Sequence, residues 1–442
     1  MKVERAVRAF AAALGGILLA GCGSLVGEKR HSPAEIAVYQ PADFVAPIAS
    51  ETERTRLHAE LRARIARAVA QSGEDPGDAL WAVKFLNQAE DAGRVLTLAA
   101  LPRLGEMSAP AQRAVLDAAH ALYAAEAAPL TLPLLQAIVT PREFAMAAYV
   151  VLRADPRPET RANIRSVLET RFPAWREEPR LIALHHALTR DANAERAARP
   201  PLEDLLAAPF RPGWPVVFSL QRTGREHFGL ALVRAGDGRF VRAADGGVFH
   251  VPQLARALSN MPGTITNGNT PQGLFSIVGA GTATSTLIGP TPYLHSKVPV
   301  EATVTEFEHA DSAAEWSEAV YESFLPPSWR PYAPVKEAWL AGRAGRDEML
   351  LHGTTIDPAL YQGRPWYPGT PSAGCLVAME YWSPADGRLM QSDQLSLAKA
   401  FTAGGLDRGY LMVVELDDQR RPVSLEEVLP ALLAAEARIA GR

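Results

Sequence analysis

The 442-residue chain has only two cysteines, Cys22 and Cys375. Cys22 follows Leu19-Ala20-Gly21 behind a short apolar run, whereas Cys375 follows Gly374 within residues 371–376. Because these contexts indicate different chemical roles for the two thiols, no pair is left for a structural disulfide. A chain of this length can bury at least one sizeable core without such a bond, and we expect two domains.

Long hydrophobic runs are also scarce. The N-terminal apolar stretch, residues 9–20, is twelve residues long, whereas a helix that crosses a bilayer needs about twenty. Lys2, Arg5 and Arg8 precede this stretch. A basic segment followed by a short apolar one predicts a cleaved secretory signal peptide over residues 1–21.

The sequence lacks an excess of positive charge. The net charge of the whole chain is −4, and removing residues 1–21 takes away three positive charges and one negative charge, which leaves −6. A mildly acidic mature protein offers no electrostatic attraction for phosphate backbones. We therefore expect no nucleic-acid partner.

The residues before the first cysteine, Leu19-Ala20-Gly21-Cys22, resemble the lipobox of bacterial lipoproteins. In such proteins the cysteine is diacylated and becomes the new N-terminus. The resemblance implies lipidation at Cys22, attachment to a membrane through this lipid, and a place in the cell envelope facing the periplasm, at the outer rather than the inner membrane. The alternative is an ordinary signal peptide with a chance cysteine.

The next two segments differ in their patterns. Residues 22–50 contain proline and lack apolar periodicity, which predicts a tether. From Ser50 the pattern becomes helical: Ser50 and Glu53 have capping-box spacing, and apolar residues then recur every four positions from Leu57. Residues 51–208 stay rich in Ala, Leu and Arg, so we predict an α-helical domain that includes a helix over residues 141–154.

The C-terminal half indicates strands. Apolar, β-branched segments predict strands over residues 215–222, 228–234, 349–351 and 410–416. Ser424 and Glu427 again have capping-box spacing and predict a C-terminal helix within residues 419–442. The chain is therefore expected to combine α and β domains, with a mainly β domain over residues 212–418, and the helical and β parts are expected to fold separately.

Chemistry concentrates at His352 and Cys375, which are 23 positions apart. A free cysteine titrates near pH 8.5, so a nucleophilic cysteine needs a nearby base. His352, at a predicted strand end, can supply that base, and Gly374 lets the backbone turn just before the thiol. The alternative is that Cys375 is a buried packing residue.

Two segments together resemble the L,D-transpeptidase family of peptidoglycan enzymes. These are residues 269–275 (NTPQGLF) and His352-Gly353 followed by residues 372–376 (SAGCL). The resemblance implies a β-sandwich fold, peptidoglycan stem peptides as partners, and no cofactor. It makes Cys375 the nucleophile, His352 its base, the carbonyl of Gly353 an orienting partner, and the amides of Gly374 and Cys375 an oxyanion hole.

The chain departs from the family pattern at two positions. Ala373 stands where the family carries a second histidine, and Val377 stands where it commonly carries arginine. Among nearby residues, Ser372, Trp366 and Tyr367 are candidates for substrate contact, although the two aromatic residues could instead cover the core. The helical domain is a candidate docking surface for a protein partner or for glycan.

The sequence disfavours several other functions. Papain-like enzymes place the cysteine before the histidine, and sortases need a different cysteine strand and a later arginine. A zinc site is disfavoured because the histidines and Cys375 lack ligand spacing. The main prediction is an L,D-transpeptidase, with two alternatives: an L,D-carboxypeptidase that uses the same site, and a catalytically impaired protein that only binds peptidoglycan.

Overall fold

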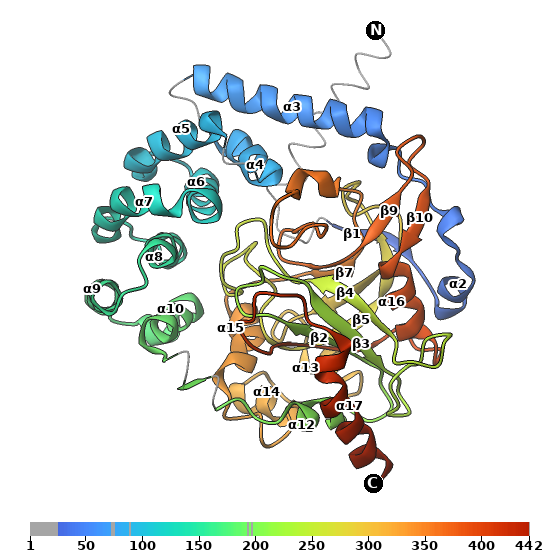
Figure 1. Cartoon of the computed structure of the whole chain (residues 1–442). Coiled ribbons are helices and arrows are strands. Elements are labelled where there is room, and N and C mark those ends of the chain that lie inside the picture. The colour runs from blue at the N-terminus through green and yellow to red at the C-terminus, as the bar shows by residue number, and fades with distance from the viewer. Residues whose placement is uncertain (1–24, 72–75, 88–89, 192–193, 196–197, 442) are drawn as a thin grey trace.

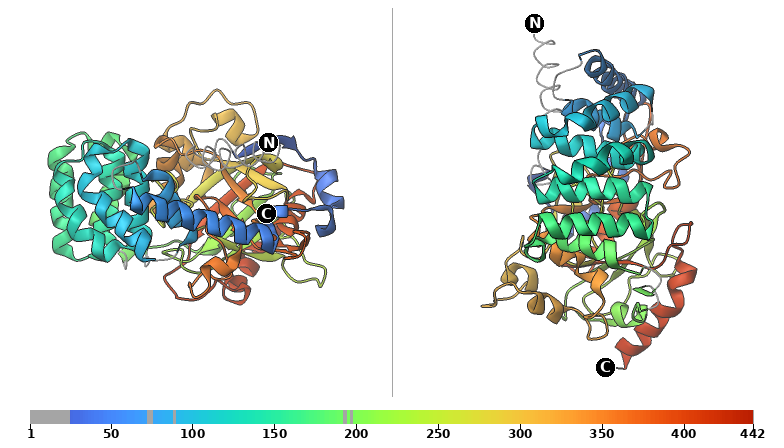
Figure 2. Two further views of the ribbon diagram at one scale, coloured as in Figure 1. Left: turned by 90° about the horizontal axis from the view of Figure 1, so that it is seen from above. Right: turned by 90° about the vertical axis from the view of Figure 1, so that its left-hand side faces the viewer.

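The computed structural model describes residues 25–71, 76–87, 90–191, 194–195 and 198–441. A curved layer of helices lies beside a β-rich unit (Figure 1), and in the side view the helices of this layer stack one after another (Figure 2). The predicted order, a helical region followed by a part with strands, is confirmed. The predicted signal peptide and Cys22 lie outside the described residues.

The helical layer forms as its sequence pattern predicts. Leu57, Leu61 and Ile65 make the buried face of the first long helix, and the helix expected over residues 141–154 has those bounds. The helices are α3 (Glu51–Ala70), α4 (Gly77–Leu86), α5 (Asp91–Ala100), α6 (Ala109–Leu122), α7 (Ala124–Thr131), α8 (Pro141–Ala154), α9 (Pro158–Arg171) and α10 (Pro179–Thr189).

The β-rich unit contains one large sheet and a separate two-stranded one, β9 (Glu380–Trp382) with β10 (Leu389–Ser392). All four strands expected from the sequence are present. In spatial order the strands of the large sheet are β1 (Val26–Arg30), β5 (Gly273–Ala283), β11 (Gly409–Glu415), β2 (Val216–Gln221), β3 (Gly229–Arg234), β4 (His250–Leu254), β8 (Leu376–Ala378), β7 (Met349–His352) and β6 (Tyr293–Lys297).

Within the described residues, this sheet closes into an eight-stranded barrel, so the expected two-sheet sandwich is not confirmed. The long strand β5 causes the closure. It pairs with β11 over Gly273–Ile277 and with β6 over Ser276–Gly281, which joins the two ends of the sheet. A sandwich keeps two sheets apart, whereas here one sheet returns to itself.

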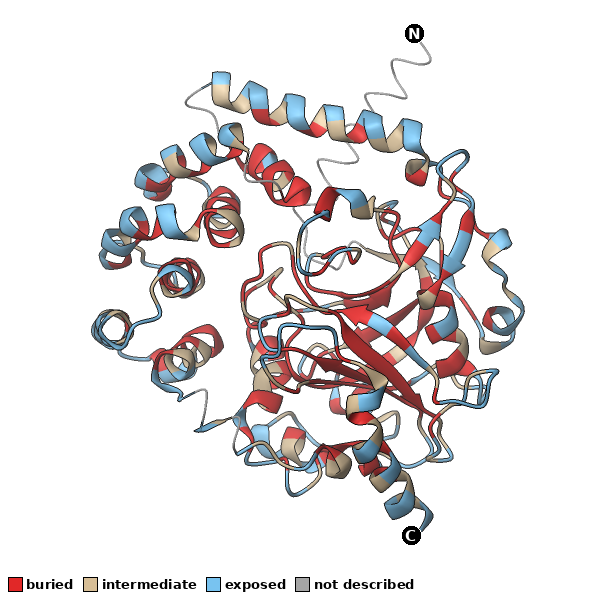
Figure 3. Cartoon of the chain, in the orientation of Figure 1, coloured by how far each residue is buried: buried red, intermediate tan, exposed pale blue. Residues whose placement is uncertain are grey.

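Side chains alternate along the strands and so build two cores. One core takes residues from all eight barrel strands, among them Val217, Phe275 and Leu376, together with α16 (Asp393–Thr402). The other core lies on the opposite face of β2, β3 and β11. It is covered by α12 (Leu202–Ala207), α13 (Val304–Glu308), α14 (Glu318–Phe324), α15 (Glu337–Arg343) and α17 (Leu425–Ala440). Figure 3 shows the barrel strands as largely buried.

The segment expected to be a tether belongs to the fold over residues 25–50. Strand β1 pairs with β5, and α2 (Pro33–Val38) begins at a capping box formed by Ser32 and Glu35. Its residue Ile36 is fully buried against the barrel core. The tether prediction was wrong here because isolated apolar residues without periodicity can still anchor short elements by long-range packing.

The core of the helical layer is shared with loops of the β unit, in addition to the two cores that the β unit has of its own. The core of the helical layer also takes in Phe228, Met261, Tyr361 and Trp366 from loops of the β unit. In addition, α12, which falls within the predicted helical domain, packs against the C-terminal helix α17. This shared core argues against the expectation that the two parts fold separately.

The predicted C-terminal helix is present as α17 and covers one side of the barrel. Among the residues that the structure describes, no helix has the length and hydropathy required to cross a membrane.

Candidate active site

The parallel strands β7 and β8 bring His352 and Cys375 together. In their register, Leu351 lies opposite Leu376 and His352 lies opposite Val377. Parallel neighbours require a crossover connection, which here is the loop that leads from His352 back to Cys375. The strand end and the cysteine turn therefore meet, and the side chains of His352 and Cys375 are hydrogen-bonded.

A backbone carbonyl fixes the orientation of the imidazole. Nδ1 of His352 lies 2.5 Å from the carbonyl oxygen of Gly353. A carbonyl oxygen can only accept a hydrogen bond, so Nδ1 carries the proton, and Nε2 is left as the acceptor for the thiol. This is the tautomer that a general base for Cys375 requires.

The environment of His352 favours the charged imidazole. Burial lowers the pKa of His352, but the hydrogen bond and charge of Cys375, with smaller contributions from Gly353 and Glu380, outweigh burial and raise it. A raised imidazole pKa beside a thiol stabilises the imidazolium–thiolate pair. The amide of Leu350 also donates a hydrogen bond to Sγ of Cys375 at 3.4 Å.

The turn before the cysteine requires glycine. Gly374 has φ +119°, and a Cβ at this position would clash with the guanidinium of Arg346 and the carbonyl of Gly268. Nη1 of Arg346 donates to the carbonyls of Gly263 at 2.6 Å and Asn269 at 2.8 Å. Arg346 thus ties the loop of residues 263–269 to the cysteine turn.

Ser372 shapes this same turn. Its hydroxyl accepts a hydrogen bond from the Gly374 amide at 3.0 Å and donates one to the carbonyl of Cys375 at 2.9 Å. The Gly374 amide is therefore already engaged and does not face an oxyanion in this conformation. The structure thus gives Ser372, a half-buried residue, a turn-forming role.

The two aromatic candidates have different surroundings. Trp366 is buried in the shared core, with the guanidinium of Arg256 at 3.9 Å from its ring centre. This burial supports the alternative that Trp366 covers the core. Tyr367 is 46% exposed and remains available to a ligand at the surface.

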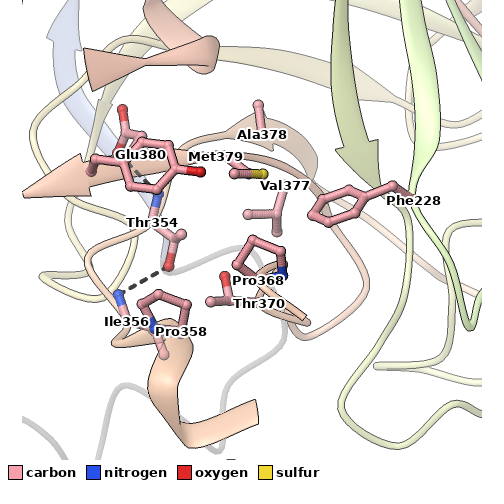
Figure 4. Close-up of a pocket in the computed structure, with 12 residues that line it drawn as sticks. Phe228, Thr354, Ile356, Pro358, Pro368, Thr370, Val377, Ala378, Met379 and Glu380 are labelled. Atoms are coloured by element: carbon pink, nitrogen blue, oxygen red, sulfur yellow. Dashed lines mark hydrogen bonds between the residues drawn. The ribbon is translucent and has the colours of Figure 1, made fainter. Parts of the chain in front are cut away.

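A small cavity lies beside β8, the strand that directly follows Cys375 (Figure 4). Val377 is one of its apolar walls, together with Phe228 and Pro368. Thr354 and Glu380 supply polar groups to the same cavity. Cys375 and His352 are not among its lining residues, so this cavity neighbours the reactive pair without exposing it.

The thiol itself is closed off in this conformation. Cys375 is 1% exposed and packs in a cluster with Ile288, Tyr293 and Leu350. Leu25 and Val26, at the start of the described chain, pack against that cluster. A substrate would reach the sulfur only after part of this cover moves.

The helical layer holds the loop that connects the two reactive residues. The hydroxyl of Tyr361 donates to the carbonyl of Phe85 at 3.1 Å, and Arg364 donates to the carbonyl of Asn87 at 2.6 Å. Because Phe85 and Asn87 belong to α4 and its C-terminal end, the helical layer fixes the crossover loop from outside the barrel.

Sequence reasoning missed Arg346 and Glu380. Arg346 is 4% exposed and Glu380 is 7% exposed. A charged residue inside an apolar strand, as in residues 379–382 (MEYW), was the available signal for Glu380, since buried charges require partners. Nothing in the local sequence of Arg346 indicates that it reaches the cysteine turn.

Metal ligands do not gather at this site. Across the described residues, no group of three or more His, Cys, Asp and Glu side chains is arranged to hold a metal ion. Comparison of the chain with protein-family models, with curated proteins and with solved structures finds no match.

Proposed function

We propose that the chain is a cysteine-dependent L,D-transpeptidase that acts on peptidoglycan stem peptides. The observation that carries the proposal is the buried His352–Cys375 hydrogen bond, with the imidazole held in the tautomer of a base by the carbonyl of Gly353. The motifs around residues 269–275 and 372–376 support the substrate class.

The reaction would proceed in two steps through a thioester. His352 takes the proton of Cys375, and Sγ attacks the carbonyl carbon of the peptide bond between an L-centre and a D-centre. The C–N bond breaks, and the leaving amine takes the proton from the imidazolium. An amine or water then attacks the thioester, His352 accepts its proton, and the thiol is released.

The acceptor in the second step decides the biological outcome. An amine of another stem would give a cross-link, an amine of a protein would give attachment, and water would give L,D-carboxypeptidase activity. The proposal also includes a lipid anchor at Cys22, which would hold the enzyme at an envelope membrane facing the periplasm, and a docking role for the helical layer.

Carbapenems test the proposal because they resemble acyl donors of this family. The wild-type protein should gain the mass of one carbapenem at Cys375. Cys375→Ala should gain none, and His352→Gln should react far more slowly because the base is lost. His295→Gln is a matched control, since His295 is also buried on a barrel strand, β6, and should leave acylation unchanged.

A second candidate is a peptidoglycan-binding protein without turnover. The near-complete burial of Cys375 and the engaged amide of Gly374 favour it. Binding of stem peptides with neither a carbapenem adduct nor turnover would support this second function. Adduct formation that survives Cys375→Ala would contradict both the proposed mechanism and the proposed nucleophile.

A further inference from the structure

A buried carboxyl group lies directly behind the reactive histidine. Glu380 is on β9, five positions after Cys375, and its side chain is 7% exposed. Its Oε1 accepts a hydrogen bond from the hydroxyl of Ser392 at 2.7 Å, and its Oε2 accepts one from the amide of Thr354 at 3.0 Å. Figure 4 shows the bond between Thr354 and Glu380.

The contact with Thr354 connects Glu380 to His352 through a single peptide group. The amide of Thr354 and the carbonyl of Gly353 belong to the same peptide bond. The amide donates to Glu380, while the carbonyl accepts from Nδ1 of His352 at 2.5 Å. Hydrogen bonds on both sides of a peptide group polarise it and strengthen each other.

The packing around Gly353 is consistent with this connection. A Cβ at position 353 would overlap the carboxyl group of Glu380. Glycine after the histidine therefore makes room for the carboxyl group against the backbone. The His-Gly pair of the sequence motif thus has a structural partner on a strand that follows the cysteine.

We infer that Glu380 is a positioning residue that activates His352 through the Gly353–Thr354 peptide group. This inference rests on the proposed function. When the proton moves from Sγ of Cys375 to Nε2 of His352, the imidazole gains a positive charge. The carboxylate, which accepts from the amide of Thr354, pushes electron density of the peptide group toward the carbonyl oxygen of Gly353. That oxygen, now more negative, stabilises the imidazolium through Nδ1–H.

Other charged groups act on this pair as well. The thiol of Cys375 interacts with Glu348, the residue before β7, and Glu348 in turn lies near Arg30 and Lys297. His352 itself is influenced by Cys375 and Glu380. Burial raises the pKa of Glu380 to about 7, so its carboxylate form predominates above neutral pH.

The test is the pH profile of iodoacetamide alkylation, followed on the Cys375 peptide by mass spectrometry from pH 5.5 to 9.5 in the full chain. For Glu380→Gln we expect the apparent thiol pKa to rise by about one unit, so that alkylation near pH 7.5 slows several-fold. Above pH 9 both proteins should react equally, because the thiol is then ionised without help from His352. A purely structural effect on access would instead change the rate at every pH.

Glu301→Gln is the matched control. Glu301 also accepts two backbone amides, from Val298 at 3.0 Å and Glu348 at 2.9 Å, and burial raises its pKa to about 7. Its profile should follow the wild type, and circular dichroism should show that both variants fold.

Two outcomes would overturn the inference, and they are distinguishable. If Glu380→Gln gives the wild-type profile while the wild-type thiol ionises well below 8.5, the connection through Gly353 and Thr354 is wrong and the proposed function stands. If the wild-type thiol itself titrates near 8.5 like an ordinary cysteine, His352 does not activate it, and both the inference and the proposed function fail.

Discussion

The carboxyl group of Glu380 also makes the stability of the fold depend on pH. Burial raises its pKa from an ordinary value of 4.5 to about 7. Between these two pH values the folded protein keeps this proton and the unfolded chain has lost it. Raising the pH therefore favours unfolding, so the stability that this group contributes is fully present below pH 4.5 and is lost as pH rises through 7.

We predict that Glu380→Gln removes this dependence. The unfolding free energy of the wild type minus that of the variant should fall by about 3 kcal/mol from pH 4.5 to pH 8, because only the wild type loses stability through this group. Urea unfolding at several pH values measures it. Asp386→Asn is the control, because hydrogen bonds from Ser383 and Arg388 lower the pKa of exposed Asp386. A difference that stays flat for Glu380→Gln would show that the buried carboxyl group is not protonated in the fold.

At the scale of elements, strand β1 and the residue before it cover the nucleophile. Leu25 and Val26 pack on the cluster that contains Cys375, and β1 is held to the edge of β5 by backbone pairing. Because these residues cover it, Cys375 is almost fully buried although it lies beside the proposed base His352. It also places the control of access at the start of the described chain, at Leu25 and Val26.

We predict that the double variant Leu25→Ala, Val26→Ala speeds alkylation of Cys375. Two smaller side chains leave the cluster less protected while the backbone pairing of β1 is retained. The rate should rise several-fold at pH 9, where thiol ionisation no longer limits it. Val38→Ala on α2, at a side chain 70% exposed, is the control. An unchanged rate in the double variant would mean that other residues provide the cover.

The sequence predicted individual elements better than their assembly. The pattern over residues 141–154 gave helix α8 with its bounds, because helical periodicity and a proline start are local signals. Closure of the barrel depends on β5 pairing with two strands far apart in the sequence, which no local pattern encodes. For the same reason the segment of residues 25–50 was misread as a tether.

In the candidate site, too, features with a local sequence signal were predictable, whereas long-range contacts were not. His352, Gly353 and Cys375 were predictable because a base, a glycine and a thiol have recognisable local contexts. Glu380 and Arg346 reach the site from a later strand and an earlier loop, through long-range packing alone. The hydrogen bonds of Ser372 within the cysteine turn and the burial of Trp366 could not be predicted, because side-chain direction depends on the turn and on the helical layer.

At the scale of the whole molecule, the helical layer and the β unit depend on each other. Phe228, Met261, Tyr361 and Trp366 are buried in the core of the helical layer, and Tyr361 and Trp366 lie on the loop between the reactive residues. The helical layer is therefore part of the support of the candidate site, in addition to any docking role.

We predict that residues 198–442 expressed alone are less stable than the full chain. Re-exposing large apolar side chains costs about 1.5–3 kcal/mol each, so the fragment should melt at a lower temperature and bind a hydrophobic dye. The measurement is thermal unfolding of fragment and full chain in the same buffer. Equal melting temperatures without dye binding would show that the two parts fold separately.

The central claim is that Cys375 forms an acyl-enzyme with a peptidoglycan stem. The most direct measurement is to mix the full-length protein with a stem tetrapeptide, quench in acid, and analyse the Cys375 peptide by mass spectrometry. We predict a thioester that carries the stem up to its L-centre in the wild type, with none in Cys375→Ala. The absence of this adduct, together with stem turnover that persists in Cys375→Ala, would contradict the claim.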